Sequence, residues 1–498
     1  MARIIGDYTG TTWEDFLVLP GMPPEDSDLT PEDVDLSSEI CGVKLKLPFM
    51  TAAMRSVTGK DLALAAGKLG MMAVAPRGLT VDREVDIVKY VKDNAVEVGD
   101  IESEYDPTTV RDDDTLNTAL QRARKTGHSN IPVVTRKSDF VGMFHYKPSR
   151  HDNMEPGTPI TDIMKKYNGN GNMPVCRSGM GDEEIKRYMD ENDLRMVPVI
   201  DEVGRLDRLV FKQRDDAYKV GAAVDTHPGW EKRAEKLIEA GADIIFIDTS
   251  DAHKKFAGDL LEKYKKLFSK GPPICGGNVV TPDGFQYLVD HGADAVKLGM
   301  GPGSICSTND VLGVGAPPFW SLVEVANRRD EYARGGHYVP LIADGGIEGT
   351  SDIIVALSKG DFIMGGRLYV CFLESEAERM DRHGKIYPKG MLSEDEIMAM
   401  KIFGEGSREA RQTTGNMRRY AAPNSKEGIS TIQGVSGWVP YQGRFKPGVE
   451  RQAMAVKEGI YHSGAVDLPT YREKAVLIRT SEKAKGTSSP HGIDLIGD

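Results

Sequence analysis

Apolar runs alternate with amphipathic stretches along most of this chain, and the rhythm predicts β-strands and α-helices in alternation. Residues 47–54 and 70–76 are apolar runs typical of buried strands, and the stretch 61–69 between them places its apolar side chains on one helical face. From residue 219 onward, six further apolar runs follow the same pattern. They span residues 220–224, 242–247, 273–275, 293–298, 339–343 and 361–364.

Strands of this kind, each followed by a helix, favour a (β/α)8 barrel. A doubly wound open sheet is the alternative, because it is built from the same βα units. The barrel is preferred because candidate chemical residues follow several different strands, as they do in the loops at the C-terminal face of a barrel. The predicted fold class is therefore α/β, a (β/α)8 TIM barrel.

Residues 99–214 interrupt the rhythm and divide the predicted barrel into a first part, 1–98, and a second part, 215–498. The interrupting segment is richer in charge and repeats one order of elements: a helix, a strand containing Pro-Val, a turn and a second strand. The Pro-Val strands are expected at 130–134 and 196–200. This repeat resembles a tandem pair of cystathionine-β-synthase-type (CBS) modules, and a simple α/β insertion is the alternative.

A second interruption, at about 374–432, is expected to form a mobile flap. Residues 374–409 are charged, contain several methionines and are predicted to be partly helical, and glycines recur through the stretch. Long loops of this kind often act as lids over active sites. The alternative is a solvated surface insertion.

Composition and charge exclude several classes of protein. The net charge of −12 over 498 residues argues against a protein that coats nucleic acid. The five cysteines are scattered and form no CxxC pair, which argues against a zinc site or a disulfide framework and favours a reducing, cytoplasmic compartment. No apolar run approaches the roughly 18 residues of a membrane span, and no signal peptide is recognised.

The stretch 297–308 carries the most distinctive candidate chemistry. It follows an apolar run and places three glycines and a proline ahead of Cys306, with hydroxyl groups at Ser304 and Thr308. Glycines allow the backbone to approach a ligand, and successive N–H groups can form an anion-binding nest. A cysteine in such a loop can be nucleophilic, although a lone cysteine is more often a small buried residue. Ser304 stands where a dinucleotide fingerprint requires glycine, which argues against a Rossmann site.

Further glycine and acidic loops follow other predicted strands. Asp344-Gly-Gly and Gly365-Gly-Arg367 could hold a phosphomonoester and a sugar, and tight βα turns are the alternative. Asp248, after another strand, could hold a second sugar. Ser250 or Asp251 beside it could cap a helix, and both interpretations could hold together. Asn278 is a candidate amide contact. Arg419 and Tyr420 lie in the predicted flap, where composition alone suggests an exposed basic run.

These motifs together resemble inosine-5′-monophosphate dehydrogenase and its sister enzyme GMP reductase. The resemblance covers nearly the whole chain and rests on the Gly-x-Gly-Pro-Gly-Ser-Ile-Cys-x-Thr loop, the two glycine loops, the CBS-like insertion and the flap. The flap motifs Phe403–Ser407, Arg419-Tyr420 and Gln433–Gly437 resemble the dehydrogenase more than the shorter reductase flap. The resemblance implies NAD-dependent oxidation of IMP to XMP, the committed step of guanine nucleotide synthesis, by a homotetramer.

The resemblance also implies roles for individual residues. Cys306 would attack carbon 2 of the hypoxanthine ring, and Thr308, Arg419 and Tyr420 would assist the water that hydrolyses the thioimidate. The IMP contacts would be Ser304, Asp344, Gly346, Gly366, Arg367, Gln433 and Met54. The NAD contacts would be Asp248, Ser250, Asn278, Gly299 and Gly301, and a monovalent cation, usually potassium, would bind carbonyls of Gly301, Gly303 and Cys306. The CBS pair would bind adenine or guanine nucleotides.

Some positions depart from the family pattern, and two other functions are kept as alternatives. The C-terminal segment that usually supplies further cation ligands reads Lys485–His491 here, without the Glu-Gly-Gly pattern. Ala52 replaces a common serine. One alternative is GMP reductase, which deaminates GMP to IMP with NADPH. The other is a catalytically silent nucleotide sensor that uses the CBS pair, which the intact Cys306 loop argues against.

Overall fold

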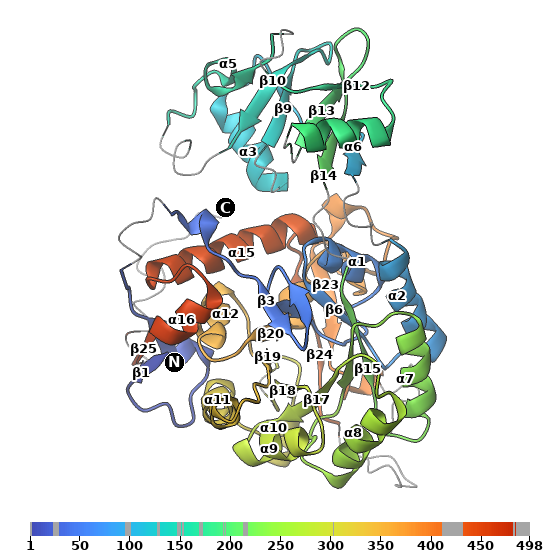
Figure 1. The fold of residues 1–498 in the computed structure, drawn as a ribbon, viewed down its shortest axis with the longest axis vertical. Coiled ribbons are helices and arrows are strands. Elements are labelled where there is room, and N and C mark those ends of the chain that lie inside the picture. Colours follow the sequence, from blue (N-terminus) through green and yellow to red (C-terminus); the bar gives the residue numbers. More distant parts are fainter. Residues whose placement is uncertain are drawn as a thin grey trace. The chain divides into compact units, whose positions relative to one another are not determined.

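The computed structural model describes most of the chain. The described residues are 2–22, 29–94, 101–126, 130–146, 151, 154–168, 173–192, 194, 196–212, 218–301, 303–410, 432–481 and 484. The chain divides into two compact units (Figure 1). The first comprises Met1–Asn94, Tyr218–Phe445 and Gln452–Asp498, and the second comprises Ala95–Ala217 and Lys446–Arg451.

A closed barrel of parallel strands forms the centre of the first unit and confirms the predicted (β/α)8 architecture. Its strands are β5 (Phe49–Thr51), β6 (Met72–Ala75), β15 (Val220–Val224), β16 (Ile244–Ile247), β17 (Ile274–Val279), β18 (Ala295–Leu298), β19 (Leu341–Asp344) and β20 (Phe362–Gly365). They pair in the order β15-β16-β17-β18-β19-β20-β5-β6. The two strands that precede the second unit in sequence therefore close the barrel between β20 and β15.

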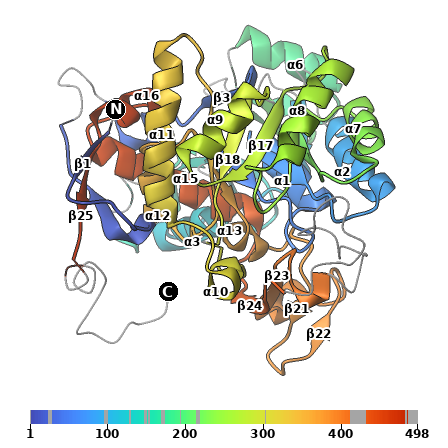
Figure 2. The same ribbon diagram turned by 90° about the horizontal axis from the view of Figure 1, so that it is seen from below.

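Helices follow the strands and surround them, as Figures 1 and 2 show for the succession α2, α7, α8, α9 and α11. The longer helices of this unit are α1 (Lys60–Lys68), α2 (Val81–Asp93), α7 (Trp230–Glu239), α8 (Lys255–Leu267), α9 (Pro282–Asp290), α11 (Pro318–Arg334), α12 (Thr350–Leu357) and α15 (Phe445–His462). Parallel strands covered on both faces need apolar side chains on both, which explains the continuous apolar runs in the sequence. Met50, Val74, Phe246 and Ile342 lie in the resulting core.

Shorter elements complete this unit. Two short helices, α10 (Thr308–Leu312) and α13 (Arg367–Val370), follow β18 and β20, and α16 (Leu468–Lys474) follows α15. A small sheet joins β1 (Arg3–Ile5), β25 (Val476–Arg479) and β2 (Phe16–Val18), and β3 (Ser38–Ile40) pairs with β4 (Val43–Leu45).

The first residues of two helices, α9 and α8, show where the local sequence does and does not determine the start of a helix. Thr281 caps α9, since its hydroxyl accepts the N–H of Gly284, and Pro282 occupies the first helical position, where proline is favoured. The predicted cap at Ser250 is wrong, because α8 begins only at Lys255. Hydrogen bonds to β17 hold the chain after β16 in an extended loop, with Ala252 N–H donating to the Asn278 carbonyl at 2.8 Å. Ser250 is thereby left in that loop.

Residues 374–440 contain a small antiparallel sheet. It consists of β21 (Arg379–Met380), β22 (Ile386–Tyr387), β23 (Ala399–Phe403) and β24 (Ser436–Pro440), in the order β22-β21-β23-β24. Helical structure is limited, within the described part, to a short turn at Glu394–Glu396 and to residues 408–410, so this segment is more extended than predicted. Arg419 and Tyr420 lie outside the described residues.

The second unit repeats one small arrangement. Each half has a four-stranded sheet, β11-β10-β9-β8 and β12-β13-β14-β7, and a helix, α3 (Leu116–Thr126) or α6 (Asp182–Glu191). The Pro-Val strands are β9 (Asn130–Val134) and β13 (Met196–Ile200). The remaining strands are β7 (Ile101–Glu104), β8 (Val110–Arg111), β10 (Phe140–His145), β11 (Lys165–Lys166), β12 (Cys176–Arg177) and β14 (Leu206–Lys212). Among the described helices, none is long and apolar enough to cross a bilayer.

Candidate active site

One large pocket lies at the C-terminal ends of the barrel strands. Its volume is about 1120 Å³ including its open mouth. The ends of β17, β18, β19 and β20 line it, together with the loops that follow β5, β16, β18, β19 and β20. Residues 402, 404–406 and Gln433, from the segment around β23 and β24, complete the lining. Active sites of (β/α)8 enzymes lie at this face, because each βα loop can deliver a different side chain.

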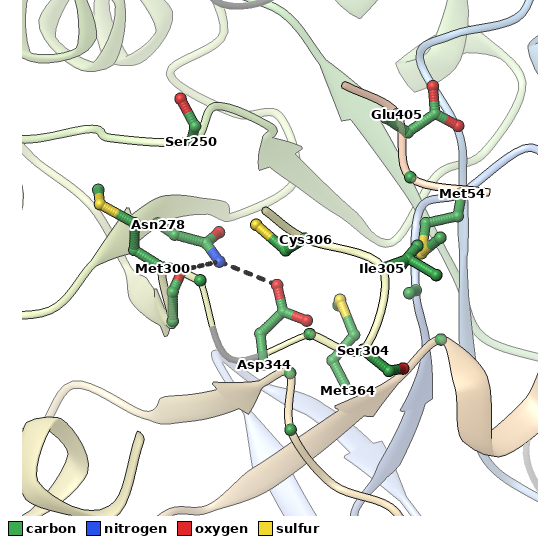
Figure 3. Close-up of a pocket in the computed structure, with 18 of the residues that line it drawn as sticks. Met54, Ser250, Asn278, Met300, Ser304, Ile305, Cys306, Asp344, Met364 and Glu405 are labelled. Atoms are coloured by element: carbon green, nitrogen blue, oxygen red, sulfur yellow. Dashed lines mark hydrogen bonds between the residues drawn. The ribbon is translucent and has the colours of Figure 1, made fainter. Parts of the chain in front are cut away.

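The loop after β18 presents Cys306 to this pocket (Figure 3). Gly299 and Gly301 adopt φ angles of 142° and 91°, a region that favours glycine. A Cβ atom on Gly299 would lie 2.0 Å from the Asp344 carbonyl oxygen, so only glycine allows the loop to pass so close to β19. Cys306 is half-buried, and its N–H donates to the Gly303 carbonyl at 2.8 Å.

Thr308 connects the thiol to the far wall of the pocket. Its Oγ1 lies 3.1 Å from Cys306 Sγ and donates to Gln433 Oε1 at 3.4 Å. Gln433 and Thr308 are both buried. Cys306, Thr308 and Gln433, all assigned to one site from sequence, therefore form one chain of contacts, although 125 positions separate Thr308 from Gln433.

A buried polar network lies beside Cys306 and orients Asp344. The Lys297 ammonium, on β18, contacts Asn278 Oδ1 and donates to Asp344 Oδ2 at 2.6 Å, while Asn278 Nδ2 donates to the same carboxylate oxygen at 2.9 Å. Asn278 Nδ2 also donates to the Gly299 carbonyl at 2.7 Å. Both donors use Oδ2, so Oδ1 can accept a hydrogen bond from a ligand (Figure 3).

The two glycine loops lie at the same pocket, in agreement with their predicted place after β19 and β20. Gly345 and Gly346 have φ angles of 94° and 73°, so this turn requires glycine. Gly346, Gly366 and Arg367 line the pocket with the exposed Ser304. The Arg367 guanidinium makes an exposed ion pair with Glu348 at 2.6 Å, and such a pair can exchange for an incoming anion at little cost.

Asp248 and Ser250 lie on another side of the pocket, after β16. One oxygen of the buried Asp248 carboxylate, Oδ2, accepts from Arg77 Nε at 3.0 Å, and Arg77 also lies 3.6 Å from Asp225. This arginine follows β6 and is itself buried. The ion pair fixes the direction of the Asp248 carboxylate at the pocket wall.

All the predicted site residues outside 411–431 line the pocket. They are Met54, Asp248, Ser250, Asn278, Gly299, Gly301, Gly303, Ser304, Cys306, Thr308, Asp344, Gly346, Gly366, Arg367 and Gln433. Sequence reasoning missed Lys297 and Glu405, which also line it. Lys297 carried a usable signal, because a charged residue inside a fully buried parallel strand needs a partner. Glu405 lies in the motif Phe403–Ser407, but its ion-pair partner could not be predicted, since Arg55 is 350 residues away.

The other cysteines differ from Cys306 in their surroundings. Burial raises the pKa of the Cys41 and Cys371 thiols to about 12 and that of Cys176 to about 11, and it also raises the pKa of Cys275. These thiols are therefore almost wholly protonated near neutral pH. None of them lines the pocket as described, which leaves Cys306 as its candidate nucleophile.

Comparisons with known proteins show the family of this chain. A family model described as "IMP dehydrogenase / GMP reductase domain" matches residues 10–491. The chain is 30% identical over 504 residues to inosine-5′-monophosphate dehydrogenase of Aquifex aeolicus (strain VF5), covering 98% of this chain and 96% of that protein. It is 30% identical over 520 residues to the enzyme of the same name from Methanocaldococcus jannaschii, covering 100% and 98%.

Solved structures show the same fold. A crystal structure of a cysteine-to-alanine variant of GMP reductase from Trypanosoma brucei, in complex with guanosine 5′-monophosphate, matches with a TM-score of 0.66 and 22% identity over 98% of both chains. At that identity the likeness concerns the fold alone. The family match over nearly the whole sequence, with a cysteine, a carboxylate and glycine loops gathered at one barrel face, means that the chain belongs to the IMP dehydrogenase / GMP reductase family of oxidoreductases.

Proposed function

We propose that this chain is an IMP dehydrogenase, which oxidises IMP to XMP with NAD and water. The observation that carries the proposal is the position of Cys306. Its thiol lies 3.1 Å from Thr308 Oγ1 in a pocket that also contains Asp344 and the two glycine loops. The sequence resemblance and the named relatives support the dehydrogenase over other members of the family.

The nucleotide would be held at three points. Ser304, Gly346, Gly366 and Arg367 would bind the phosphate through N–H and guanidinium groups. Asp344 Oδ1 would accept hydrogen bonds from the ribose hydroxyls, because Oδ2 already accepts from Lys297 and Asn278. Gln433 would contact the base, with Met54 packing beside it. Together these contacts would bring carbon 2 of the base close to the thiol. The attack then takes place between two groups that are already held together, which lowers its entropic cost.

The first half of the reaction is covalent. The Cys306 thiolate would attack carbon 2 of the base. NAD, held by residues that line the same pocket, would supply the acceptor for the hydride lost from that carbon. The product is a thioimidate that links XMP to the enzyme. Splitting the oxidation in this way replaces one difficult displacement by two easier steps. No further oxidant is needed, because NAD takes both electrons.

The second half is hydrolysis. Water attacks carbon 2 of the thioimidate, the carbon–sulfur bond breaks, and XMP leaves with the thiol restored. Thr308 Oγ1 is within hydrogen-bonding distance of Sγ and is therefore close enough to contact such a water. Arg419 and Tyr420, assigned from the resemblance, would assist its deprotonation.

The residues around the thiol also suit NAD and a monovalent cation. Asp248, Ser250, Asn278, Gly299 and Gly301 line the pocket and would bind the dinucleotide. For a cation, the donors would be carbonyls of Gly301, Gly303 and Cys306. Among the described backbone hydrogen bonds of this loop, none ends on the Gly301 or Cys306 carbonyl, so these oxygens suit a hard cation such as potassium. Such an ion would hold the loop that carries Cys306.

The second unit and the assembly belong to the same proposal. We assign residues 99–214 as a tandem CBS pair that binds adenine or guanine nucleotides, supported by two halves with the same helix and Pro-Val strand. The full enzyme would be a homotetramer. The enzyme would catalyse the committed step of guanine nucleotide synthesis.

One experiment tests the proposal against the alternatives. The purified chain is incubated with IMP and NAD while NADH absorbance is followed, and separately with GMP and NADPH while ammonia is measured. NADH from IMP supports the dehydrogenase. Ammonia from GMP without NADH from IMP would assign GMP reductase, and silence in both would favour a nucleotide sensor.

A further inference from the structure

An ion pair between Arg55 and Glu405 joins two walls of the pocket. Arg55 directly follows Met54 in the loop after β5, and Glu405 lies between Gly404 and Gly406, so each partner adjoins backbone that lines the pocket. Arg55 Nε lies 3.2 Å from Glu405 Oε2, and the Arg55 backbone N–H donates to Oε1 at 2.9 Å. Both side chains are almost fully buried, with 7% and 4% of their surface exposed.

The arginine holds more than the carboxylate. Its Nη2 donates to the Ala410 carbonyl at 2.9 Å, and its guanidinium lies 5.5 Å from the centre of the Phe403 ring. One side chain thus contacts both ends of the segment 403–410. Gly78 packs against the pair so closely that an added Cβ would lie 2.9 Å from Arg55 Nε.

The segment held in this way continues to the Cys306 loop. Gly404 N–H donates to the Val435 carbonyl at 3.0 Å, and Val435 N–H donates to the Ile305 carbonyl at 2.9 Å. Gly434 also forms an isolated β-bridge with Cys306. The wall opposite the thiol and the thiol's own loop are therefore connected through backbone hydrogen bonds.

The carboxylate itself does not face the thiol. Figure 3 shows Glu405 near Met54, with its carboxylate directed away from Cys306. Glu405 is therefore not placed to exchange protons at the reacting carbon. What the ion pair fixes is the backbone at 404–406, against which the base of a bound nucleotide would lie.

We propose that Arg55 and Glu405 are positioning residues, which hold the 404–406 wall at the distance that aligns the base with Cys306. This inference rests on the proposed function for its kinetic consequence. The phosphate and ribose contacts lie on other loops, so loss of the pair should leave IMP binding largely intact and slow the chemical step. Lysine cannot reproduce this arrangement, because Arg55 donates through Nε to the carboxylate and through Nη2 to the Ala410 carbonyl, and a single ammonium nitrogen cannot occupy both positions.

The test compares variants of the full chain in the first turnover with IMP and NAD. Arg55→Lys keeps the charge but loses the fork, and the double variant Arg55→Met with Glu405→Met leaves no unpaired buried charge that would impair folding. In both we expect the rate of NADH formation to fall by roughly 10-fold or more, with KM for IMP changed by less than about 3-fold, as for a small misplacement of reacting groups.

Arg329→Lys is the matched control. Arg329 pairs with Asp361 at 3.1 Å, each with 4% of its side chain exposed, and Asp361 precedes β20 at the opposite end of the barrel. This variant should lose thermal stability to a similar degree but keep the first-turnover rate. Equal slowing in the control, or an unchanged rate in both pocket variants, would overturn the proposal.

A second readout does not depend on the reaction. The rate at which iodoacetamide alkylates Cys306, measured by mass spectrometry, should rise by roughly 3-fold or more in the pocket variants, because the wall bonded to the thiol's loop opens more often. It should not rise in Arg329→Lys. A wild-type chain that forms no NADH from IMP would refute the proposed function alone, and unchanged alkylation would then refute the positioning role.

Discussion

Replacing Lys297 with Met should weaken recognition of the ribose rather than of the whole nucleotide. The ammonium lies 2.6 Å from Asp344 Oδ2, and the lysine side chain is only 7% exposed. Methionine keeps an unbranched chain of similar length but removes the charge. Asn278 would then be the remaining described side-chain donor to that oxygen, and the carboxylate could rotate.

The size of the effect follows from this contact. Two unit charges 2.6 Å apart attract by about 6 kcal/mol at an effective dielectric constant of about 20, but desolvation of a buried pair offsets most of that attraction. A hydrogen bond to a charged group is worth about 1.5–3 kcal/mol net. If the contact between Asp344 and the ribose depends on the hydrogen bond from Lys297, kcat/KM for IMP should fall by about 10- to 150-fold.

The assay measures kcat/KM for IMP and for 2′-deoxy-IMP in wild type and variant. The deoxy substrate lacks one hydroxyl that Asp344 would hold, so its kcat/KM should fall less than that of IMP. The ratio of the two kcat/KM values, IMP over 2′-deoxy-IMP, should therefore shrink by about 10-fold. Lys265→Met is a control for the loss of a lysine–aspartate ion pair away from the pocket, because the more exposed Lys265 makes a 2.6 Å ion pair with Asp294 at the other end of β18. If Lys297→Met lowers kcat/KM for IMP and for 2′-deoxy-IMP by the same factor, Lys297 does not act through the ribose contact and the reasoning fails.

Three further predictions concern the nucleophile, the hydrolysis step and the thiols. Cys306→Ala should abolish NADH formation while IMP still binds by calorimetry, and residual turnover above a few per cent would remove Cys306 as the nucleophile. Arg419→Ala should slow release of XMP more than the first burst of NADH in stopped-flow experiments, whereas equal slowing of both phases would count against its role with water. At pH 8, iodoacetamide should label Cys306 before the other cysteines, as peptide mapping would show. Burial raises the pKa of Cys176 to about 11 and that of Cys41 and Cys371 to about 12. A thiol with a raised pKa stays protonated, and therefore unreactive, until the pH approaches that pKa. Early labelling of Cys176 or Cys41 would contradict this order.

Local pattern was enough to predict the barrel and the loops that line its pocket, whereas the roles of individual residues came from the resemblance to a known family. A buried parallel strand needs apolar side chains on both faces, so the runs at 220–224 and 293–298 could be recognised without knowledge of their neighbours. Glycines in the Cys306 loop and at Gly345 and Gly346 mark backbone that other residues rarely adopt. Because βα loops emerge at one face of a barrel, the predicted chemistry of separate strands had to converge there.

What the sequence by itself determined was therefore which residues are buried, where the chain turns and which end of the barrel carries the chemistry. Only the tertiary structure decided how the buried charges are paired. Lys297 pairs with Asp344 across adjacent strands, Arg77 with Asp248 over 171 residues, and Arg55 with Glu405 over 350. It also left Ser250 in a loop, because hydrogen bonds to β17 delay the start of α8. The physical reason is that burial and turns are encoded locally, whereas the partner of a buried charge depends on which strands and loops the closed barrel brings together.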